Sequence, residues 1–277
     1  MHIDLHSHST ASDGTLSPSE LVRFAAAHGV ETLAITDHDT VAGYDDLPED
    51  LPLQLICGVE FSCLWQGRTI HVVGLNVDRG NHSLVRLVER QQAARLQRAH
   101  IIADRLCRLK LADSFDDVFA RHSGAPGRPD FARALLARGA VADVQTAFKK
   151  YLGAGKRGDV KTLWPDLDTV IDSIRAAGGV AVLAHPSKYR LTRSKLTTLL
   201  SAFTRAGGEA IEVVCGHQDP ATTRQLADLC VDFGLLASCG SDFHSEAQTW
   251  SRPGRFPDLP RRLTPVWSRW TRSSSTT

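Results

Sequence analysis

The alternation of strand-like and helix-like segments limits the possible folds of this 277-residue chain more than any other feature. Seven short apolar segments have the length and composition of β-strands, and most of them precede a helical pattern. The predicted strands cover 2–8, 31–39, 53–63, 69–77, 179–186, 209–214 and 235–244. Such alternation predicts a parallel sheet with helices outside it, either a closed barrel or an open doubly wound sheet. No GxGxxG sequence follows the first strand, which argues against a dinucleotide-binding fold.

The segment between the fourth and fifth strands departs from this pattern. A long helical pattern covers 83–109, and three shorter helices with glycine-containing loops are predicted before residue 159. We therefore expect an α/β barrel or sheet formed by 1–80 and 162–277, interrupted by a small, mostly helical insertion at 81–161.

Charge is distributed unevenly between these two parts. Residues 81–161 contain 16 Lys and Arg against 8 Asp and Glu, a net charge of +8. The whole chain contains 32 basic and 31 acidic residues, which leaves 16 and 23 for the remainder, a net charge of −7. An acidic body suits cations, and a basic insertion suits an anionic ligand. Arg-rich, solvated helix faces explain the same numbers equally well.

The cysteines and the hydropathy pattern bear on the compartment. Six cysteines show no CxxC spacing, and several lie in apolar stretches, so we expect them to be reduced and mostly buried. The chain has neither the pattern of a signal peptide nor the run of about 20 apolar residues that spans a membrane. We expect a cytoplasmic protein, and no membrane or obligate protein partner is implied.

The first strand carries an unusual set of polar side chains. Because successive side chains of a strand point to opposite faces, His2, Asp4, His6 and His8 are expected to share one face. A polar edge strand explains the HxH pattern about equally well. However, His6 and His8 stand at the carboxyl end of the strand, where α/β proteins build their sites, and Asp13 follows in the next loop. His2, at the other end, is interpreted as a surface residue.

Further metal-binding side chains lie on later strands or at their ends. They are His38, Glu60, His71, His185, Asp242 and His244. Each histidine alone is explained by ordinary hydrogen bonding, but the carboxyl ends of barrel strands converge on one face, so we expect all nine ligands to meet there. Glu60 has apolar neighbours, and a buried carboxylate costs several kcal/mol unless it meets a cation or is protonated.

This ligand set constrains the metal. Six imidazoles and three carboxylates without cysteine suit Mn²⁺, Zn²⁺ or Fe²⁺ rather than Ca²⁺ or an iron–sulfur cluster. Nine ligands exceed the need of one ion, so we expect two or three divalent ions, Mn²⁺ being the first choice, with Glu60 bridging. Asp37 and Asp39 flank His38, and one of them is a candidate acceptor for an imidazole. Asp39 is expected to be a solvated loop carboxylate.

The segments DLHSHSTASDGTLSP, AITDHDT, GVEFS, HVVGL, AHP and GSDFH resemble the motifs of the PHP (polymerase and histidinol phosphatase) superfamily over essentially the whole chain. The insertion sequences GRPDFARALLARGAV and AFKKYLGAGKRGDV resemble its RNase AM / 3′,5′-nucleotide bisphosphate phosphatase group. The resemblance implies a distorted (β/α)₇ TIM-like barrel with a trinuclear metal site. The implied ligands are His6, His8, Glu60 and Asp242 for one ion, Glu60, His71 and His185 for a second, and Asp13, His38 and His244 for a third.

The resemblance also implies a phosphoesterase. It would convert 3′,5′-nucleotide bisphosphates to 5′-nucleotides and phosphate, or degrade short 5′-phosphorylated RNA or DNA from the 5′ end. Divalent ions generate hydroxide near neutral pH, so a metal-bridging hydroxide would attack without a Ser, Cys or Thr nucleophile. The predicted catalytic residues are Asp13, Glu60, His185 and His244. The predicted substrate-binding residues, on an insertion expected to act as a lid, are Arg128, Arg133, Lys149, Lys150, Lys156 and Arg157.

Three alternatives remain at this point. A different PHP phosphatase, such as a histidinol-phosphate phosphatase, would share the metals but not the basic insertion. An amidohydrolase-type enzyme usually needs a carboxylated lysine, and no lysine stands at a predicted strand end. A non-catalytic nucleic-acid-binding module with vestigial metal sites would show degraded ligands, and none of the nine is degraded. Stacking aromatic residues among the basic ones would support such a module. The aromatic residues of the insertion are expected mostly in the helix core.

Overall fold

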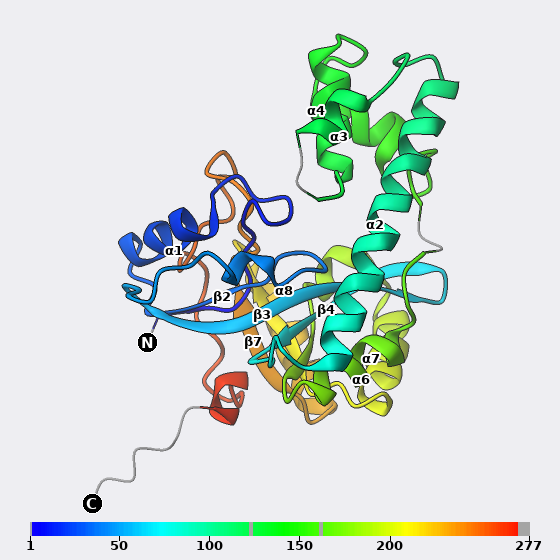
Figure 1. Cartoon of the computed structure of the whole chain (residues 1–277). Helices are drawn as coiled ribbons and strands as arrows, with labels where there is room; N and C mark the ends of the chain where they lie inside the picture. The colour runs from blue at the N-terminus through cyan, green and yellow to red at the C-terminus, as the bar shows by residue number, and fades with distance from the viewer. Residues whose placement is uncertain (1, 122–123, 161–162, 271–277) are drawn as a thin grey trace, which may run out of the picture. The chain divides into compact units, whose positions relative to one another are not determined.

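The computed structural model describes residues 2–121, 124–160 and 163–270 (Figure 1). The chain divides into two compact units. The first, which we call the barrel unit, comprises 1–65, 69–88 and 165–277, and the second, the helical unit, comprises 66–68 and 89–164. The helical unit begins its main segment at Glu89 rather than at residue 81, because Leu84 and Leu87 pack into the main apolar core of the barrel unit.

Seven strands form one sheet in chain order, and they match the seven predicted segments. They are β1 (Ile3–Asp4), β2 (Thr32–Ile35), β3 (Gln54–Trp65), β4 (Arg68–Leu75), β5 (Val180–Leu183), β6 (Ala210–Cys215) and β7 (Leu236–Gly240). The prediction of a wholly parallel sheet is wrong at one strand, since β4 is antiparallel to β5. Only Gln66 and Gly67 separate β3 from β4, and a parallel pair needs a crossover of a dozen or more residues.

The sheet is nearly closed into a barrel, which excludes the open-sheet alternative. The Leu5 amide donates to the Cys239 carbonyl at 3.1 Å, and the Asp242 amide donates to the His6 carbonyl at 2.8 Å. These bonds join the first strand to the last. Gly240 permits the approach, because a Cβ added there would lie 2.3 Å from Cβ of His6.

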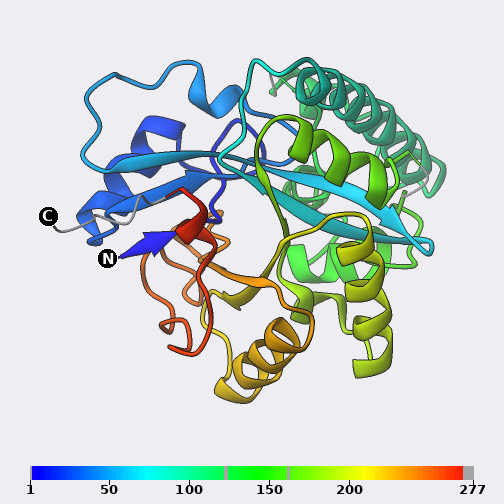
Figure 2. The ribbon, with the colours of Figure 1, turned by 90° about the horizontal axis from the view of Figure 1, so that it is seen from below.

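Helices cover the outside of the strands (Figure 2). They are α1 (Pro18–Ala27), α6 (Leu167–Ala176), α7 (Arg193–Arg205) and α8 (Pro220–Asp232), with short 3₁₀ turns η1 (Ala42–Tyr44), η3 (Pro186–Tyr189) and η4 (Val266–Arg269). Val72 and Leu183 pack in the core cluster that contains α6, α7 and α8. Their neighbours Val73 and Val182 belong to a separate cluster. Side chains on these strands therefore alternate between the helix layer and the barrel interior.

The helical unit has its own apolar core. The unit contains the later part of α2 (His82–Arg108), then α3 (Asp116–Ala120), α4 (Arg128–Ala137), α5 (Val144–Ala147) and the π-helical turn η2 (Phe148–Leu152). Phe115 and Phe131 are buried in this core, and Phe119, Phe148 and Tyr151 pack against it. The aromatic residues are thus mainly core residues, as predicted, which disfavours a stacking surface for single-stranded nucleic acid.

Two further observations bear on the setting of the protein. All six cysteines are free, and Cys63, Cys215, Cys230 and Cys239 are buried, in agreement with the expectation. Within the described residues, no helix combines the length and apolar character that crossing a membrane requires.

Candidate metal centre

Strand alternation places the central carboxylate inside the barrel. Val59 and Phe61 on β3 belong to the core cluster under the outer helices, so Glu60 between them points to the interior. His71 on β4 lies between Ile70 and Val72, which belong to the same cluster, and it also points inward. Because β4 runs antiparallel, His71 reaches the centre from within its strand and not from a carboxyl end.

The remaining predicted ligands lie in loops that follow the other strands. His6, His8 and Asp13 follow β1, His38 follows β2, His185 follows β5, and Asp242 and His244 follow β7. The regular alternation predicted for residues 2–8 ends at Asp4. That side chain accepts hydrogen bonds from the amides of Ser241 (2.9 Å), Gly254 (3.3 Å) and His6 (3.3 Å). His2 is exposed, as predicted.

All nine predicted ligands meet in one cluster. Their donor atoms fall into four groups in which every atom lies within 4.8 Å of the others. The groups are His8, Asp13, His38 and His244; His6, His8 and Glu60; His6, His185 and Asp242; and His38, Glu60 and His71. The chain therefore offers several overlapping sites of three or four nitrogen and oxygen ligands, which is the donor set expected for a divalent transition metal.

Glu60 lies at the centre of the cluster. Its Oε1 lies 2.8 Å from Nδ1 of His71 and 2.8 Å from Nε2 of His185. Its Oε2 lies 3.0 Å from Nδ1 of His38 and 3.3 Å from Nε2 of both His6 and His8. One carboxylate thus faces five imidazoles, which is the position that a bridging ligand needs.

The cluster is closed on one side and accessible on the other. The side chains of His8 and Glu60 are fully buried, whereas those of His71 and His244 are 24% and 23% exposed. Asp13 joins the exposed side, with Oδ1 3.4 Å from Nε2 of His244. A small substrate can therefore approach the centre from the side of Asp13, His71 and His244.

Unpaired polar atoms in the cluster fit a bound cation. Among the described residues, Nε2 of His6, both ring nitrogens of His8 and Oε2 of Glu60 are buried without a hydrogen-bond partner. Such atoms cost free energy unless something else satisfies them. Burial and nearby His244 lower the pKa of His8 to about 3, so its imidazole is neutral and keeps a lone pair for a cation.

The two central carboxylates are ionised. Burial by itself raises the pKa of Glu60, but His71, His38 and His6 hold it well below its usual value. Burial likewise raises the pKa of Asp242, and there His6 and Lys188 lower it by more. Neutral imidazole and anionic carboxylates are the forms in which these side chains bind metals.

Comparisons with known proteins identify the family. The model of the PHP domain family matches residues 4–160. The chain is similar to a 5′-3′ exoribonuclease of Haemophilus influenzae, with 41% identity covering 96% of this chain and 98% of that protein. It is also similar to a 3′,5′-nucleoside bisphosphate phosphatase of Chromobacterium violaceum, with 37% identity covering 96% and 95% of the two chains.

The fold comparison agrees. The structure of an amidohydrolase from Chromobacterium violaceum with bound sulfate and no metal is similar to this one, with a TM-score of 0.88 and 35% identity, covering 97% of this chain and 95% of that one. The chain belongs to the PHP domain family. The resemblance noted in the sequence is therefore confirmed, and so is the prediction of a metal-dependent phosphoesterase built on the PHP barrel.

The sequence interpretation missed an acidic residue beneath the PHP ligands. Glu212 on β6 is buried, and its Oε1 lies 3.1 Å from Nδ1 of His6. Its Oε2 accepts a 2.6 Å hydrogen bond from the His185 amide. Glu212 thus orients one imidazole and fixes the backbone that carries another. The signal was present, since Glu212 has apolar neighbours in AIEVV just as Glu60 has in GVEF.

Two residues of η3 were also missed. The Lys188 ammonium forms an ion pair with Oδ2 of Asp242, on the carboxylate whose other oxygen faces the histidines. The Tyr189 hydroxyl accepts from the His71 amide at 2.9 Å and donates to the Ala184 carbonyl at 2.8 Å. No spacing rule in the sequence links these residues to strands β4 and β7.

The expectation for Asp39 is wrong. Asp39 is fully buried, and its Oδ1 accepts a 2.7 Å hydrogen bond from the Ser62 amide. Asp37 is buried as well, and it accepts bonds from Ser9 and Ser12 rather than from an imidazole. Both carboxylates therefore shape the loops beside His38. Sequence alone could not show this, because a TDHD segment between a strand and a loop has the composition of a solvated turn.

The backbone is strained at two ligands. His185 and Asp242 adopt positive φ angles of 27° and 53°, a region that non-glycine residues rarely enter. The Glu212 carboxylate holds the His185 amide, and the His6 carbonyl holds the Asp242 amide. Strain that is maintained in this way is typical of functional sites.

The six predicted substrate-binding residues all belong to the helical unit. Arg128 opens α4, and its Nη1 donates to the Leu152 carbonyl at 3.2 Å. Arg133 pairs with Asp130 one turn earlier on the same helix, at 2.6 Å. The remaining four are exposed to solvent, namely Lys149, Lys150, Lys156 and Arg157. Their role stays a prediction.

Proposed function

We propose that the chain hydrolyses phosphate esters of nucleotides, releasing phosphate from 3′,5′-nucleotide bisphosphates and nucleotides from the 5′ end of 5′-phosphorylated RNA. The observation that carries this proposal is the buried Glu60 carboxylate, which faces five imidazoles within 3.3 Å. The relatives named as an exoribonuclease and as a nucleoside bisphosphate phosphatase support the substrate class.

We propose that two or three divalent ions, Mn²⁺ first among them, bind this cluster. Two of these ions would be held by residues of the groups around Glu60, namely Glu60, His6, His8, His71, His185 and Asp242. Asp13, His38 and His244 would hold a further ion, and His8 joins their group in the structure. When bound, such ions lower the pKa of water and offset the negative charge of a phosphate.

The side chains of the chain perform the remaining tasks. Glu212 and the ion pair of Lys188 with Asp242 fix the orientation of the ligands before the substrate arrives. In the reaction, an oxygen of water adds to phosphorus and gives up one proton, the bond from phosphorus to the 3′ oxygen breaks, and that oxygen takes up a proton. The less buried residues Asp13 and His244 lie where a proton can be exchanged with solvent.

We further propose that the insertion, residues 81–161, contributes the contacts to a second phosphate or to the next nucleotide. Its net charge of +8 supports this role. We also propose a cytoplasmic location, because six free cysteines suit a reducing compartment. We disfavour an amidohydrolase-type enzyme, since Glu60 would take the bridging position and Lys188 contacts the carboxylate of Asp242.

A substrate comparison tests the proposal. Protein stripped with a chelator and reloaded with Mn²⁺ is incubated with adenosine 3′,5′-bisphosphate, with a 5′-phosphorylated RNA oligomer, with its 5′-hydroxyl counterpart and with histidinol phosphate. We expect turnover of the first two, a marked preference for the 5′-phosphorylated oligomer over its counterpart, and no turnover in the stripped protein. Faster hydrolysis of histidinol phosphate than of both nucleotide substrates would contradict the proposal.

A further inference from the structure

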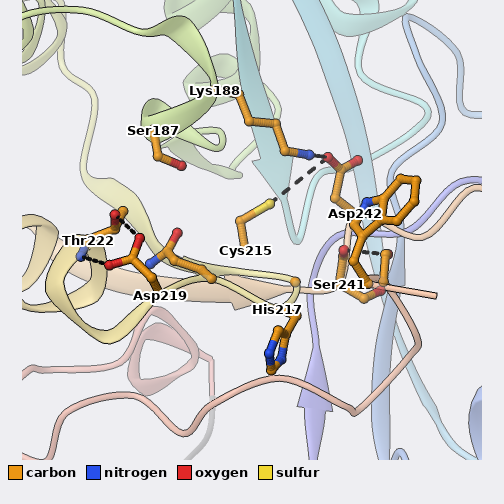
Figure 3. A pocket seen from close by; sticks show the side chains of 12 residues that line it. Ser187, Lys188, Cys215, His217, Asp219, Thr222, Ser241 and Asp242 are labelled. Atoms are coloured by element: carbon orange, nitrogen blue, oxygen red, sulfur yellow. Dashed lines mark hydrogen bonds and ion pairs between the residues drawn. The ribbon is translucent and has the colours of Figure 1, made fainter. Parts of the chain in front are cut away.

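A cavity opens beside the ligand cluster, within the barrel unit. Its volume is about 290 Å³, and Ser187, Lys188, Asp219, Asp242 and Trp250 are among the residues that line it (Figure 3). Asp242 connects it to the cluster, because Oδ1 of this residue lies 3.3 Å from Nε2 of His8. A phosphate bound at the cluster would therefore have this space next to it for the group that the ester carries.

The charges around the cavity favour an uncharged occupant. Figure 3 shows Lys188 directed at Asp242, so its positive charge is already paired. The first turn of α8 also lines the cavity, but the Asp219 carboxylate accepts from the amides of Ala221 and Thr222 at 2.9 Å each. The helix end that would otherwise attract an anion is thus capped. A second phosphate would find no available partner in these two groups.

The rim of the cavity offers a flat apolar surface. Trp250 is 61% exposed, the largest exposed fraction among the large apolar side chains of the described residues. Its backbone is fixed, because the His217 amide donates to the Trp250 carbonyl at 3.0 Å. The next residue is fixed too, since the Ser251 hydroxyl donates to the Ser241 carbonyl at 2.7 Å. An exposed indole on an anchored segment, at the mouth of a cavity, is suited to stacking on a planar ring.

We infer that this cavity binds the sugar and base of the nucleotide whose phosphate lies at the metal centre, with Trp250 as the stacking surface. The inference rests on the proposed function and adds the site for the uncharged part of the substrate. The volume is at the lower end of ligand pockets, which span about 300–1,000 Å³. It suits one nucleoside and not a longer oligomer. Stacking on a single indole tolerates any base, so we expect little base specificity.

The test combines a deletion in the protein with a deletion in the substrate. Trp250→Ala and Trp250→Phe are compared with wild type on adenosine 3′,5′-bisphosphate and on its abasic analogue, which keeps the sugar and both phosphates. Trp250→Ala should lower kcat/KM for the nucleotide by about 5- to 150-fold and leave kcat/KM for the abasic analogue unchanged. For the nucleotide, kcat/KM of Trp250→Phe should lie between those of Trp250→Ala and wild type. Trp270→Phe changes a tryptophan that follows η4, packs against a core cluster and does not line the cavity, so it should have no effect on either substrate.

The outcomes separate the inference from the proposed function. Equal slowing of both substrates by Trp250→Ala, or slowing of neither, would overturn the inference even if the wild-type protein hydrolyses the nucleotide well. A wild-type protein that hydrolyses neither nucleotide substrate would refute the proposed function instead. Binding is followed independently by tryptophan fluorescence. Adenosine should quench wild type and Trp270→Phe, and quenching that persists in Trp250→Phe contradicts the inference.

Discussion

Replacing Glu60 by Gln tests the centre of the proposed metal site. The substitution keeps the shape of the side chain but removes its negative charge. Glu60 belongs to two of the four ligand groups, whereas Asp13 belongs to only one. Glu60→Gln should therefore lower the affinity for two ions, whereas Asp13→Asn should lower the affinity for one. The amide also leaves buried imidazoles poorly paired, which adds a cost in the metal-free protein.

The size of the effect follows from linkage between metal binding and folding. An ion supplied at 100 times its Kd stabilises the folded protein by about 2.7 kcal/mol. We take a 100-fold loss of affinity for that ion, which is about the upper end of the effect of removing a hydrogen-bond partner from a metal ligand. The stabilisation that the ion provides then falls to about 0.4 kcal/mol. The loss is about 2.3 kcal/mol for one ion and about 4.6 kcal/mol for two. At about 2–4 °C per kcal/mol, Glu60→Gln should reduce the metal-induced rise in Tm by roughly 9–18 °C.

The assay is a thermal unfolding titration of chelator-treated protein with MnCl₂, read together with the metal content after desalting. Asp13→Asn should lose about half as much of the metal-induced rise as Glu60→Gln. Glu209→Gln is a control, because this carboxylate pairs with Arg269 and belongs to none of the four groups. A wild-type Mn²⁺ response and near-normal activity in Glu60→Gln would refute the bridging role. Fewer than one transition ion per reconstituted wild-type chain would refute the metal centre itself.

Three further substitutions have distinct expected outcomes. Asp13→Asn and His244→Ala should each remove most turnover and leave the metal-free Tm unchanged, as measured by steady-state kinetics and calorimetry. Lys188→Met should lower kcat/KM about equally for a nucleotide and for p-nitrophenyl phosphate, with partial rescue by Lys188→Arg, because it releases Asp242 from its ion pair. Arg128→Ala should lower kcat/KM for a 3′,5′-bisphosphate about 10- to 150-fold and hardly affect p-nitrophenyl phosphate.

The sequence predicted the strands and the nine clustered ligands because both depend on local patterns. An apolar segment of strand length that ends in His or Asp is visible without knowledge of the fold, and convergence at a barrel end follows from topology. Glu60 shows the strength of this reasoning, since its apolar neighbours on β3 required it to be buried and therefore partnered. The same reasoning, applied to Glu212, would have found the residue that orients His6.

Other features depend on contacts between distant segments, and no local pattern reports them. Asp4 belongs to the same predicted face as His6 and His8, yet it binds backbone amides near the end of the chain. Asp39 resembles a solvated turn residue until β3 packs over it. The direction of β4 was open to inference from the two-residue turn before it, but the β/α alternation around it suggested a parallel strand. Tertiary contacts decided the cases of Asp4 and Asp39, whereas a local turn decided the direction of β4.

Arg128 illustrates how the structure sharpens a prediction drawn from charge alone. Its side chain is 34% exposed, its Nη1 donates to the Leu152 carbonyl at 3.2 Å, and the same nitrogen lies 3.9 Å from Oδ1 of Asp159. Arg128→Ala therefore removes a contact inside the helical unit as well as a charge, so a loss of activity has two explanations. Arg128→Lys keeps the positive charge but loses the planar guanidinium, so it should retain part of the wild-type kcat/KM for the bisphosphate.

A charge-matched control separates the two explanations for Arg128. Arg108→Ala removes an exposed positive charge from the same unit, where Arg108 pairs with Asp104, and it should leave both substrates unaffected. If Arg128 contacts the second phosphate, raising salt should narrow the difference between the bisphosphate and p-nitrophenyl phosphate, because exposed charges are screened over about 8 Å at physiological ionic strength. Equal slowing of both substrates by Arg128→Ala means that the residue serves the fold or the reacting phosphate. If neutralising all six predicted substrate-binding residues slows the hydrolysis of neither substrate, these basic side chains only form a solvated surface.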